Sequence, residues 1–249
     1  MGIFIKLTSY KTFCYTSHMN TKKIGIIGGV GPQSTDFIYE KIIEFAQSKY
    51  SAKNNSDFPR ILIDSVPVPD FISNKDNIES AEQMLIESAR TLSSAGATRL
   101  CIGSNTVHIL LEKLRSQTDV PFISMIELVA DECVNRGFKK VGLLGTPVLV
   151  GSGIYQKVLK EKSIETVLPT EEQLKVVETL IRNVIAGTQS SQTKNEYIGV
   201  LNDMFSKGAE AIILGCTELP LAVNYEALGD RTLNSDEILA KGIVDYYYT

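Results

Sequence analysis

The chain has 249 residues, of which 43% are hydrophobic and 22% charged, and it carries a formal net charge of −4. This composition is typical of a globular protein with one large domain or two modest ones, and the mild negative charge argues against a nucleic-acid-binding surface. No apolar run approaches the roughly 18–20 residues of a membrane-spanning helix, and no secretory leader is recognisable, so we expect a cytoplasmic protein. Four scattered cysteines and two distant histidines argue against a disulfide framework and a metal site.

Residues 1–19 differ from the rest of the chain, because the first 18 residues contain no acidic side chain and show no periodicity. We interpret this segment as an N-terminal extension before a natural start at Met19, and it takes no part in the fold prediction. The remaining sequence predicts strands at 24–27, 60–66 and 100–102, and helices at 34–50, at 78–94 and after residue 106. Alternating strands and helices indicate a parallel α/β architecture, with functional groups at the carboxyl ends of the strands.

An internal repeat is the most informative feature of the sequence. Three segments of the first half recur in the second half in the same order: 22–28 (KKIGIIG) as 139–145 (KKVGLLG), 96–106 (GATRLCIGSNT) as 208–218 (GAEAIILGCTE), and 127–130 (ELVA) as 237–240 (EILA). Parallel α/β strands often resemble one another, so one match would mean little. Three matches in register argue against chance.

We therefore predict two pseudo-symmetric α/β lobes, each a mostly parallel sheet flanked by helices, with the active site in the cleft between them. One lobe would contain residues 20–119 and 228–249, and the other residues 120–227. The repeat aligns Ser104 with Cys216, and each follows a buried strand and precedes a helix. Both side chains are therefore expected to face the cleft from opposite sides.

The loops 103–106 and 215–218 suggest a reaction. A helix N-terminus carries partial positive charge and N–H groups that hold a carboxylate, and it lowers the pKa of a cysteine placed there. Cys216 can therefore be a thiolate at neutral pH. An acid bound between the loops would present its α-carbon to Ser104 on one face and to Cys216 on the other. Removing a proton from one face and returning one to the other inverts that carbon.

Plainer interpretations stand beside these. Cys216 can be a small buried hydrophobic residue, although Cys101 in a strand and Cys133 in a helix fit that role better. Glu218 can orient Cys216 or a substrate ammonium group, or it can cap a helix. His108 can assist proton transfer or make structural hydrogen bonds.

The glycine-rich loop 28–32 (GGVGP) fits neither the G-x-G-x-x-G dinucleotide pattern nor the G-K-[ST] ending of a P-loop. We interpret it as a loop that closely approaches the cleft.

At these residues the sequence resembles the aspartate/glutamate racemase family, within a wider group that includes hydantoin racemases, maleate isomerases and arylmalonate decarboxylases. The matching segments are GGVGP at 28–32, SNTVH at 104–108 and GCTELP at 215–220, and the resemblance extends over about residues 20–249. It implies two pseudo-symmetric lobes, a reaction without PLP, metal or other cofactor, and a homodimer.

The resemblance also implies roles for individual residues. Cys216 is similar to the second catalytic cysteine of the family, and Ser104 stands where most of these racemases carry their first. A serine hydroxyl is a far weaker acid than a thiol, but some racemases of the group carry threonine there, and the decarboxylases use a single cysteine. The candidate substrate-binding residues are Asn105, Thr106 and Thr217, implied to hold the α-carboxylate, together with Gly29, Pro32, Phe71, His108 and Glu218.

Two departures from the family pattern concern the substrate. Aspartate-specific members of the family that this chain resembles carry Pro-Asp-Arg after the second strand, and they carry a lysine before an Ala-Gly pair in the second lobe. This chain has Phe71 in place of the arginine and Ile185 in place of the lysine. Loss of both cations weakens the case for aspartate and favours a neutral or longer side chain against an apolar wall of Phe71 and Ile185. Arg60 or Lys75 is an alternative source of positive charge.

Three functions stay open from the sequence. The leading hypothesis is a cofactor-independent amino-acid racemase with an unequal Ser104/Cys216 pair. The second is a single-cysteine decarboxylase or isomerase of the same group, and the third is a non-catalytic amino-acid-binding protein. In each case the partner is a small amino or carboxylic acid, and neither nucleic acid nor membrane is expected.

Overall fold

The computed structural model describes residues 21–69, 73, 75–222 and 229–249. The interpretation of residues 1–19 and the role expected for Phe71 therefore concern residues outside the described part of the chain. Among the described residues, no helix is long and apolar enough to cross a lipid bilayer.

Helices and strands alternate along both halves of the chain. The first half contains β1 (Ile24–Gly28), α1 (Pro32–Tyr50), the 3-10 helix η1 (Asn55–Asp57), β2 (Ile61–Ser65), α2 (Ile78–Ser94), β3 (Arg99–Ile102), the 3-10 helix η2 (Thr106–Leu110), α3 (Leu111–Arg115), β4 (Phe122–Ile123) and α4 (Met125–Asn135). The second half contains β5 (Lys140–Gly145), α5 (Pro147–Ser152), α6 (Ile154–Glu161), β6 (Glu165–Val167), α7 (Glu171–Ile185), α8 (Ser191–Ser206), β7 (Ala211–Gly215), α9 (Leu219–Ala222), β8 (Thr232–Asn234) and α10 (Ser235–Tyr248).

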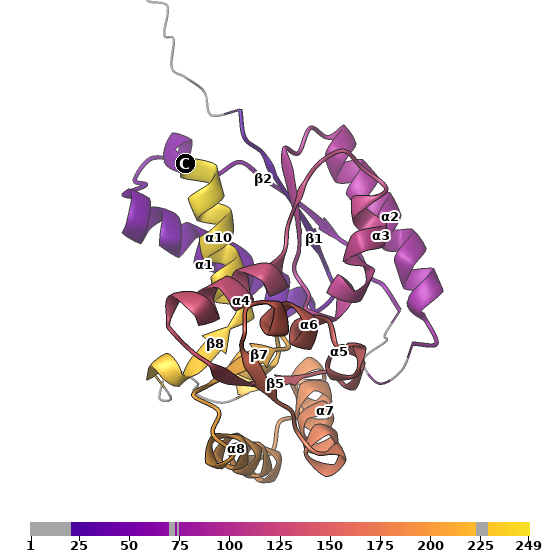
Figure 1. Ribbon diagram of the computed structural model, residues 1–249. Coiled ribbons are helices and arrows are strands. Elements are labelled where there is room, and N and C mark those ends of the chain that lie inside the picture. The colour runs from indigo at the N-terminus through magenta and orange to yellow at the C-terminus, as the bar shows by residue number, and fades with distance from the viewer. Residues whose placement is uncertain (1–20, 70–72, 74, 223–228) are drawn as a thin grey trace, which may run out of the picture.

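Within the described residues, the strands form two four-stranded parallel sheets, in the orders β2-β1-β3-β4 and β6-β5-β7-β8. The second order repeats the first with every strand number raised by four, and the three repeated segments lie in corresponding elements: β1 and β5, β3 and β7, and α4 and α10. The two-lobed α/β fold predicted from the repeat is therefore confirmed, and Figure 1 shows one lobe above the other. The predicted strands and helices of the first lobe are also present, with bounds that differ by one or two residues.

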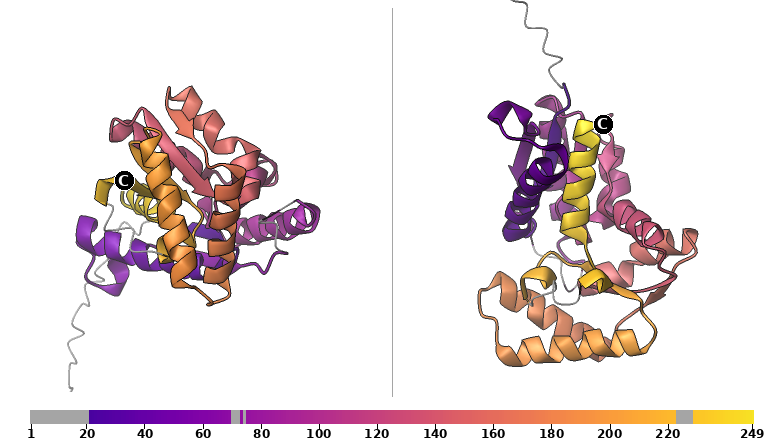
Figure 2. Two further views of the ribbon diagram at one scale, coloured as in Figure 1. Left: turned by 90° about the horizontal axis from the view of Figure 1, so that it is seen from below. Right: turned by 90° about the vertical axis from the view of Figure 1, so that its left-hand side faces the viewer.

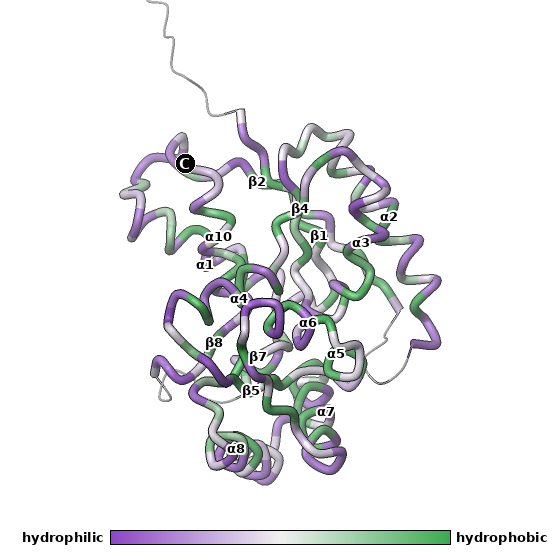
Figure 3. Tube along the Cα trace, viewed as in Figure 1, coloured by the Kyte–Doolittle hydropathy of each residue, from purple (hydrophilic) through white to green (hydrophobic). Residues whose placement is uncertain are grey.

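Each sheet is covered by helices on both faces, which explains why the central strands are uninterrupted apolar runs. All residues of β1 (IGIIG) and β7 (AIILG) are buried. The first sheet packs against α1 and α10 on one face and against α2 on the other, and the second sheet packs against α7 and α8 and against α4 and α6. In Figure 3 the outer helices α2 and α8 alternate between hydrophobic and hydrophilic colours, as expected for helices with one buried side.

The last helix of each half packs away from its own sheet. Helix α10 lies along α1 in the first lobe, as the right-hand view of Figure 2 shows, and α4 packs against α6 in the second. Strand β4 nevertheless pairs with β3, and β8 with β7. The division of the chain at residues 119 and 227 stays a prediction. After each of these points, the strand (β4 or β8) pairs with the sheet of its own half, whereas the helix that follows it (α4 or α10) packs in the other lobe.

The loop after β1 is held close to its neighbours by two glycines in the left-handed region. Gly29 has a φ of +82°, and a Cβ built there would lie 2.4 Å from the Val66 nitrogen. Gly31 has a φ of +85°, and its Cβ would lie 2.9 Å from Oε1 of Glu218 in the second lobe. The Thr35 hydroxyl accepts a hydrogen bond from the Gly29 N–H at 3.0 Å and fixes the loop to α1. This close approach across the lobes is the role expected for the loop 28–32.

We predict that Gly29→Ala destabilises the protein more than Gly187→Ala. Both residues have a positive φ, but a Cβ on Gly187 meets no atom within 4 Å. The Gly187 variant should lose about 1–2 kcal/mol of unfolding free energy from backbone strain, and the Gly29 variant roughly 3 kcal/mol or more, because the Val66 backbone must also move. Urea unfolding of both variants measures the difference, and equal losses would contradict the close approach.

Candidate active site

A cavity of about 300 Å³ lies between the two lobes. Such a volume suits a small molecule, and residues of both halves form its wall. The lining residues are Gly29, Val30, Gly31, Val68, Pro69, Ser104, Asn105 and Thr106 from the first half, and Thr146, Arg182, Ile185, Cys216, Thr217 and Glu218 from the second. Ser104 and Cys216, aligned by the repeat, thus line one cavity.

The central strands place these two residues. Ser104 follows β3 by two positions, and Cys216 directly follows β7. Each of these strands runs between two parallel neighbours, so its carboxyl end opens at the edge of the sheet where ligands bind in α/β folds. Ser104 is 7% exposed and Cys216 is 6% exposed, so a bound ligand would need little further closure to exclude water from them.

Cys216 and Glu218 form a hydrogen-bonded pair inside the cavity wall. The Cys216 thiol donates to Oε2 of Glu218 at 2.9 Å, and the Thr217 hydroxyl donates to the same oxygen at 2.9 Å. Burial, followed by the negative charge of Glu218 and this hydrogen bond, raises the pKa of Cys216 well above its ordinary value. The thiol and its adjacent carboxylate therefore form a proton donor and acceptor in direct contact.

The suggestion that Cys216 can be a thiolate at neutral pH is therefore wrong for this structure. That suggestion relied on helix N-termini, but the turn after Ser104 is the 3-10 helix η2, and α9 after Cys216 has four residues. Short helices sum few peptide dipoles, so their end charge is small. Desolvation and the carboxylate outweigh it, and both stabilise the neutral thiol.

A second buried acid lies behind this pair at the start of α10. Asp236 is 1% exposed, and neither of its carboxyl oxygens has a well-formed hydrogen bond with a described group, although the Ser34 hydroxyl lies close. Burial and then the charge of Glu218 raise the pKa of Asp236 well above its ordinary value. The neutral, protonated form of Asp236 is therefore favoured.

The loops carrying the candidate carboxylate-binding residues are fixed by side-chain hydrogen bonds. Asn105 accepts from the Tyr155 hydroxyl at 2.7 Å and donates to Ser235 at 2.9 Å. The hydroxyls of Thr106 and Thr146 share a hydrogen bond of 2.9 Å that joins the two lobes. These side-chain contacts therefore hold the loops in place at the cavity wall.

Comparison with known proteins identifies the family. The family described as Asp/Glu/Hydantoin racemase matches residues 27–238. The chain belongs to this family. The family resemblance noted in the sequence is thus confirmed. Its relatives are named as racemases, which are isomerases, so the expected enzyme class is confirmed as well.

Three proteins show how far the likeness to other racemase-family proteins extends. A broad-specificity amino-acid racemase of Bacillus subtilis is 29% identical over 224 residues, which cover 90% of this chain and 97% of the relative. The crystal structure of an aspartate racemase homologue from Pyrococcus horikoshii is 33% identical with a TM-score of 0.76, and the match covers 92% of this chain and 100% of that one. The aspartate racemase of Picrophilus torridus superposes with a TM-score of 0.77 at 29% identity, over 91% and 94% of the two chains.

Not every residue predicted for this racemase-family site reaches the cavity. Gly29, Asn105, Thr106, Thr217 and Glu218 line it, but Pro32 does not, because it begins α1 behind the loop.

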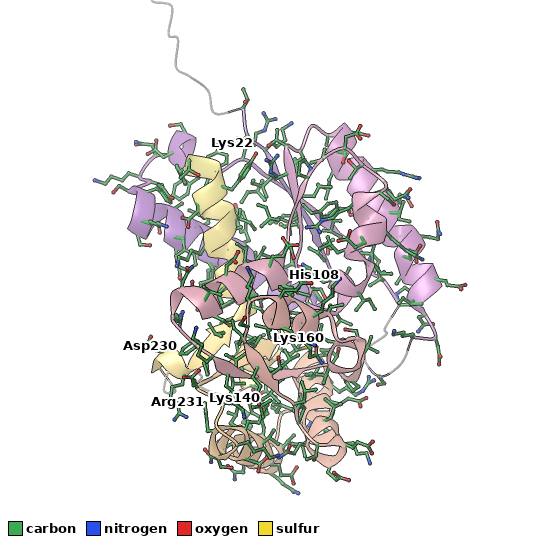
Figure 4. All side chains as sticks on the ribbon, in the orientation of Figure 1. Lys22, His108, Lys140, Lys160, Asp230 and Arg231 are labelled. Carbon is green, nitrogen blue, oxygen red and sulfur yellow. The ribbon has the colours of Figure 1, made fainter. Side chains whose placement is uncertain are left out.

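His108 also lies outside the cavity wall, near the junction of the lobes (Figure 4). Its Nε2 accepts a hydrogen bond from the Met125 N–H at 3.1 Å, so the ring proton is on Nδ1, which donates to the Ser104 carbonyl at 2.8 Å. Both ring nitrogens are therefore engaged with the backbone. This arrangement gives His108 a positioning role for the Ser104 loop and leaves neither nitrogen for proton transfer.

The sequence did not indicate Thr146, Arg182, Val68 or Pro69 as part of the wall. Thr146 could have been found, because the repeat aligns it with Gly29. Arg182 lies one helical turn before Ile185, the residue expected in an apolar wall, which does line the cavity. Arg60 and Lys75, considered as alternative cations, are not among the lining residues. In the part of the chain that the structure describes, no group of three or more His, Cys, Asp or Glu side chains is arranged to hold a metal ion.

We predict that His108 stays neutral down to about pH 4, because burial lowers its pKa from the usual 6.5 to about 4. A folded-state pKa below the unfolded one stabilises the fold above pH 6.5, and this contribution is lost as the pH falls to 4. The loss is on the order of 3 kcal/mol. The difference in unfolding free energy between wild type and His108→Gln, measured in urea at several pH values, should shrink by that amount. A difference that stays constant from pH 7 to pH 4 would contradict the buried neutral ring.

Proposed function

We propose that this chain is a cofactor-independent amino-acid racemase that inverts the α-carbon with Cys216 on one face and Ser104 on the other. One observation carries the proposal: two residues from equivalent positions of the repeated halves line one cavity of amino-acid size. The family name and the names of the relatives agree with it. The homodimer and the cytoplasmic location stay predictions.

The proton of the thiol must leave before Cys216 can act as a base. The Glu218 carboxylate already accepts a hydrogen bond from this thiol, so it is the group that takes the proton. A substrate ammonium group beside Glu218 would favour the transfer, because a nearby positive charge lowers the pKa of the thiol. The thiolate then removes the Cα proton, and the electron pair stays on the α-carbon and its carboxylate.

Ser104 completes the inversion from the opposite face. Its hydroxyl donates a proton to the carbanion, and the backbone N–H groups of the loops 104–106 and 216–217 stabilise the negative charge on the substrate carboxylate. Before the next turnover, the serine oxygen regains a proton from solvent, and Glu218 releases to solvent the proton that it took from the thiol. Because a hydroxyl is a much weaker acid than a thiol, the step at Ser104 is the slower one.

We predict that Cys216→Ala abolishes exchange of the Cα proton, whereas Ser104→Ala abolishes inversion alone. Without Ser104, Cys216 can still remove and return a proton on its own face, so one enantiomer should exchange deuterium and keep its configuration. Ser104→Cys should speed inversion, because a thiol is a stronger acid. Proton NMR in D₂O and chiral chromatography of a panel of L- and D-amino acids measure exchange and inversion separately. Undiminished exchange in Cys216→Ala would overturn the proposal.

We also predict that Glu218→Gln lowers the exchange rate by about 10²–10⁴-fold at neutral pH, since an amide cannot accept the thiol proton. The substitution also removes the negative charge that raises the pKa of Cys216. The deficit should therefore narrow as the pH rises and solvent deprotonates the thiol. The matched control is Glu171→Gln, an equal charge change on an exposed residue of α7. A deficit that does not depend on pH would assign Glu218 a structural role.

The cavity wall supports one alternative, since Cys216 is its single thiol among the described lining residues. A decarboxylase or isomerase needs one proton donor to protonate an enolate. Release of CO₂ from a malonate-type substrate, without exchange at the α-carbon of any amino acid, would favour this second function.

A further inference from the structure

Thr106 and Thr146 are two buried hydroxyl-bearing residues that meet across the lobes in the cavity wall. Thr106 begins η2 in the first half, and Thr146 directly follows β5 in the second. They are 7% and 2% exposed, and their hydroxyl oxygens lie 2.9 Å apart. The family resemblance implies a carboxylate-binding role for Thr106 and none for Thr146.

The hydrogen bonds of this pair leave one hydroxyl proton over. The Thr146 oxygen also accepts a hydrogen bond from the Leu149 N–H at 3.1 Å, which uses no hydroxyl proton because a backbone N–H group only donates. The bond between the two threonines uses one of their two hydroxyl protons, whichever residue donates. Among the described residues, neither hydroxyl has a further hydrogen-bond partner. The spare proton is therefore on Thr146 if Thr106 donates, and on Thr106 if Thr146 donates.

A spare hydroxyl proton in a buried wall matches an anionic oxygen of a ligand. Buried polar groups in proteins are nearly always hydrogen-bonded, and the cavity that both residues line is where such a partner can bind. A carboxylate oxygen accepts hydrogen bonds and cannot donate them. Because the two hydroxyl oxygens are only 2.9 Å apart, a carboxylate within reach of one can also reach the other.

The equivalent position in the second half has the opposite hydrogen-bonding character. The repeat aligns Thr106 with Glu218, and both residues line the cavity. Oε2 of Glu218 accepts hydrogen bonds from Cys216 and Thr217, whereas the threonine pair has a proton to donate. An amino acid needs both kinds of partner, an acceptor for its ammonium group and a donor for its carboxylate. These two positions would therefore orient it in the cavity.

We propose that Thr146 is a substrate-binding residue, which forms with Thr106 a shared donor that gives the substrate carboxylate one hydrogen bond from either hydroxyl. This inference rests on the proposed function in one respect only, that the ligand of the cavity is an amino acid. It adds a residue of the second lobe to the carboxylate site.

A shared donor is redundant, and redundancy has a distinct signature in a double-mutant cycle. Thr106→Val leaves the hydroxyl of Thr146 to donate, and Thr146→Val leaves that of Thr106, so each single variant should raise Kd less than about threefold. The double variant should raise Kd about tenfold or more, because a hydrogen bond to a charged group is lost. A pair that only joins the lobes would give the opposite pattern, since either single substitution already breaks its bond and the second adds nothing.

NMR titration of the full chain with racemic alanine, glutamine, glutamate and lysine measures Kd, and turnover leaves a racemate unchanged. The values compared are those for the probe that the wild type binds most tightly. Thr146→Val loses the same contact with Leu149 as the double variant, so this loss cannot explain a larger effect in the double variant. Thr106→Val/Thr146→Ser returns one hydroxyl and should bind within about threefold of the wild type. Thr106→Ala/Thr146→Ala serves as a second double variant with smaller side chains.

Three results would overturn the role of the pair: a single variant as weak as the double, a double variant as tight as the wild type, or a wild type that binds none of the four probes. Exchange of the Cα proton together with either of the first two results would leave the racemase proposal standing. A large loss of affinity in the double variants alone, without exchange of any amino acid, would support the shared donor and overturn the racemase proposal.

Discussion

The hydrogen bond from the Cys216 thiol to the Glu218 carboxylate is the interaction on which the site depends. Burial and the carboxylate charge both favour the neutral thiol, so the resting site holds Cys216, the base of the proposed reaction, in its protonated form. The proposed reaction therefore needs a positive charge to move the proton, and an amino acid carries one beside the bond to be broken. The same hydrogen bond constrains the surrounding chain, because Gly31 must lack a side chain where Glu218 reaches across the lobes. Protonation state, loop conformation and substrate charge are therefore coupled at one carboxylate.

The repeat explains how the Cys216–Glu218 pair comes to line one cavity with Ser104 of the other half. Differences between the two halves explain why Cys216 and Ser104 have different surroundings. Both lobes end a central strand in a tight loop at the cavity, and Ser104 and Cys216 occupy the equivalent positions. The surroundings differ, since Cys216 contacts a carboxylate two residues later, whereas the carbonyl of Ser104 is held by a neutral histidine. In the proposed reaction, one half thus supplies the base and the other a weakly acidic hydroxyl. The symmetry of the fold brings the two groups to one ligand without making them equal.

Much of this arrangement could be predicted from the sequence because it is encoded locally or by the repeat. Apolar runs and glycines mark β1, β3 and β7, and the repeat alone brings Ser104 and Cys216 to one cavity. The protonation state of Cys216 could not be predicted, because it depends on burial and on helix lengths that short motifs do not determine. Likewise, the hydrogen bond from Met125 to His108 joins residues 17 positions apart, and no spacing rule indicates it.

The wall facing a substrate side chain shows a further limit of sequence reasoning about specificity. Cations at two positions of a family pattern are missing here, and a third position, Arg182, supplies one from α7, one turn before the second of them. The spacing from Glu178 to Arg182 is visible in the sequence, but it reads as an ordinary surface ion pair until the helix is seen to border the cavity. A lining arginine indicates an acidic ligand only when its own charge is left uncompensated.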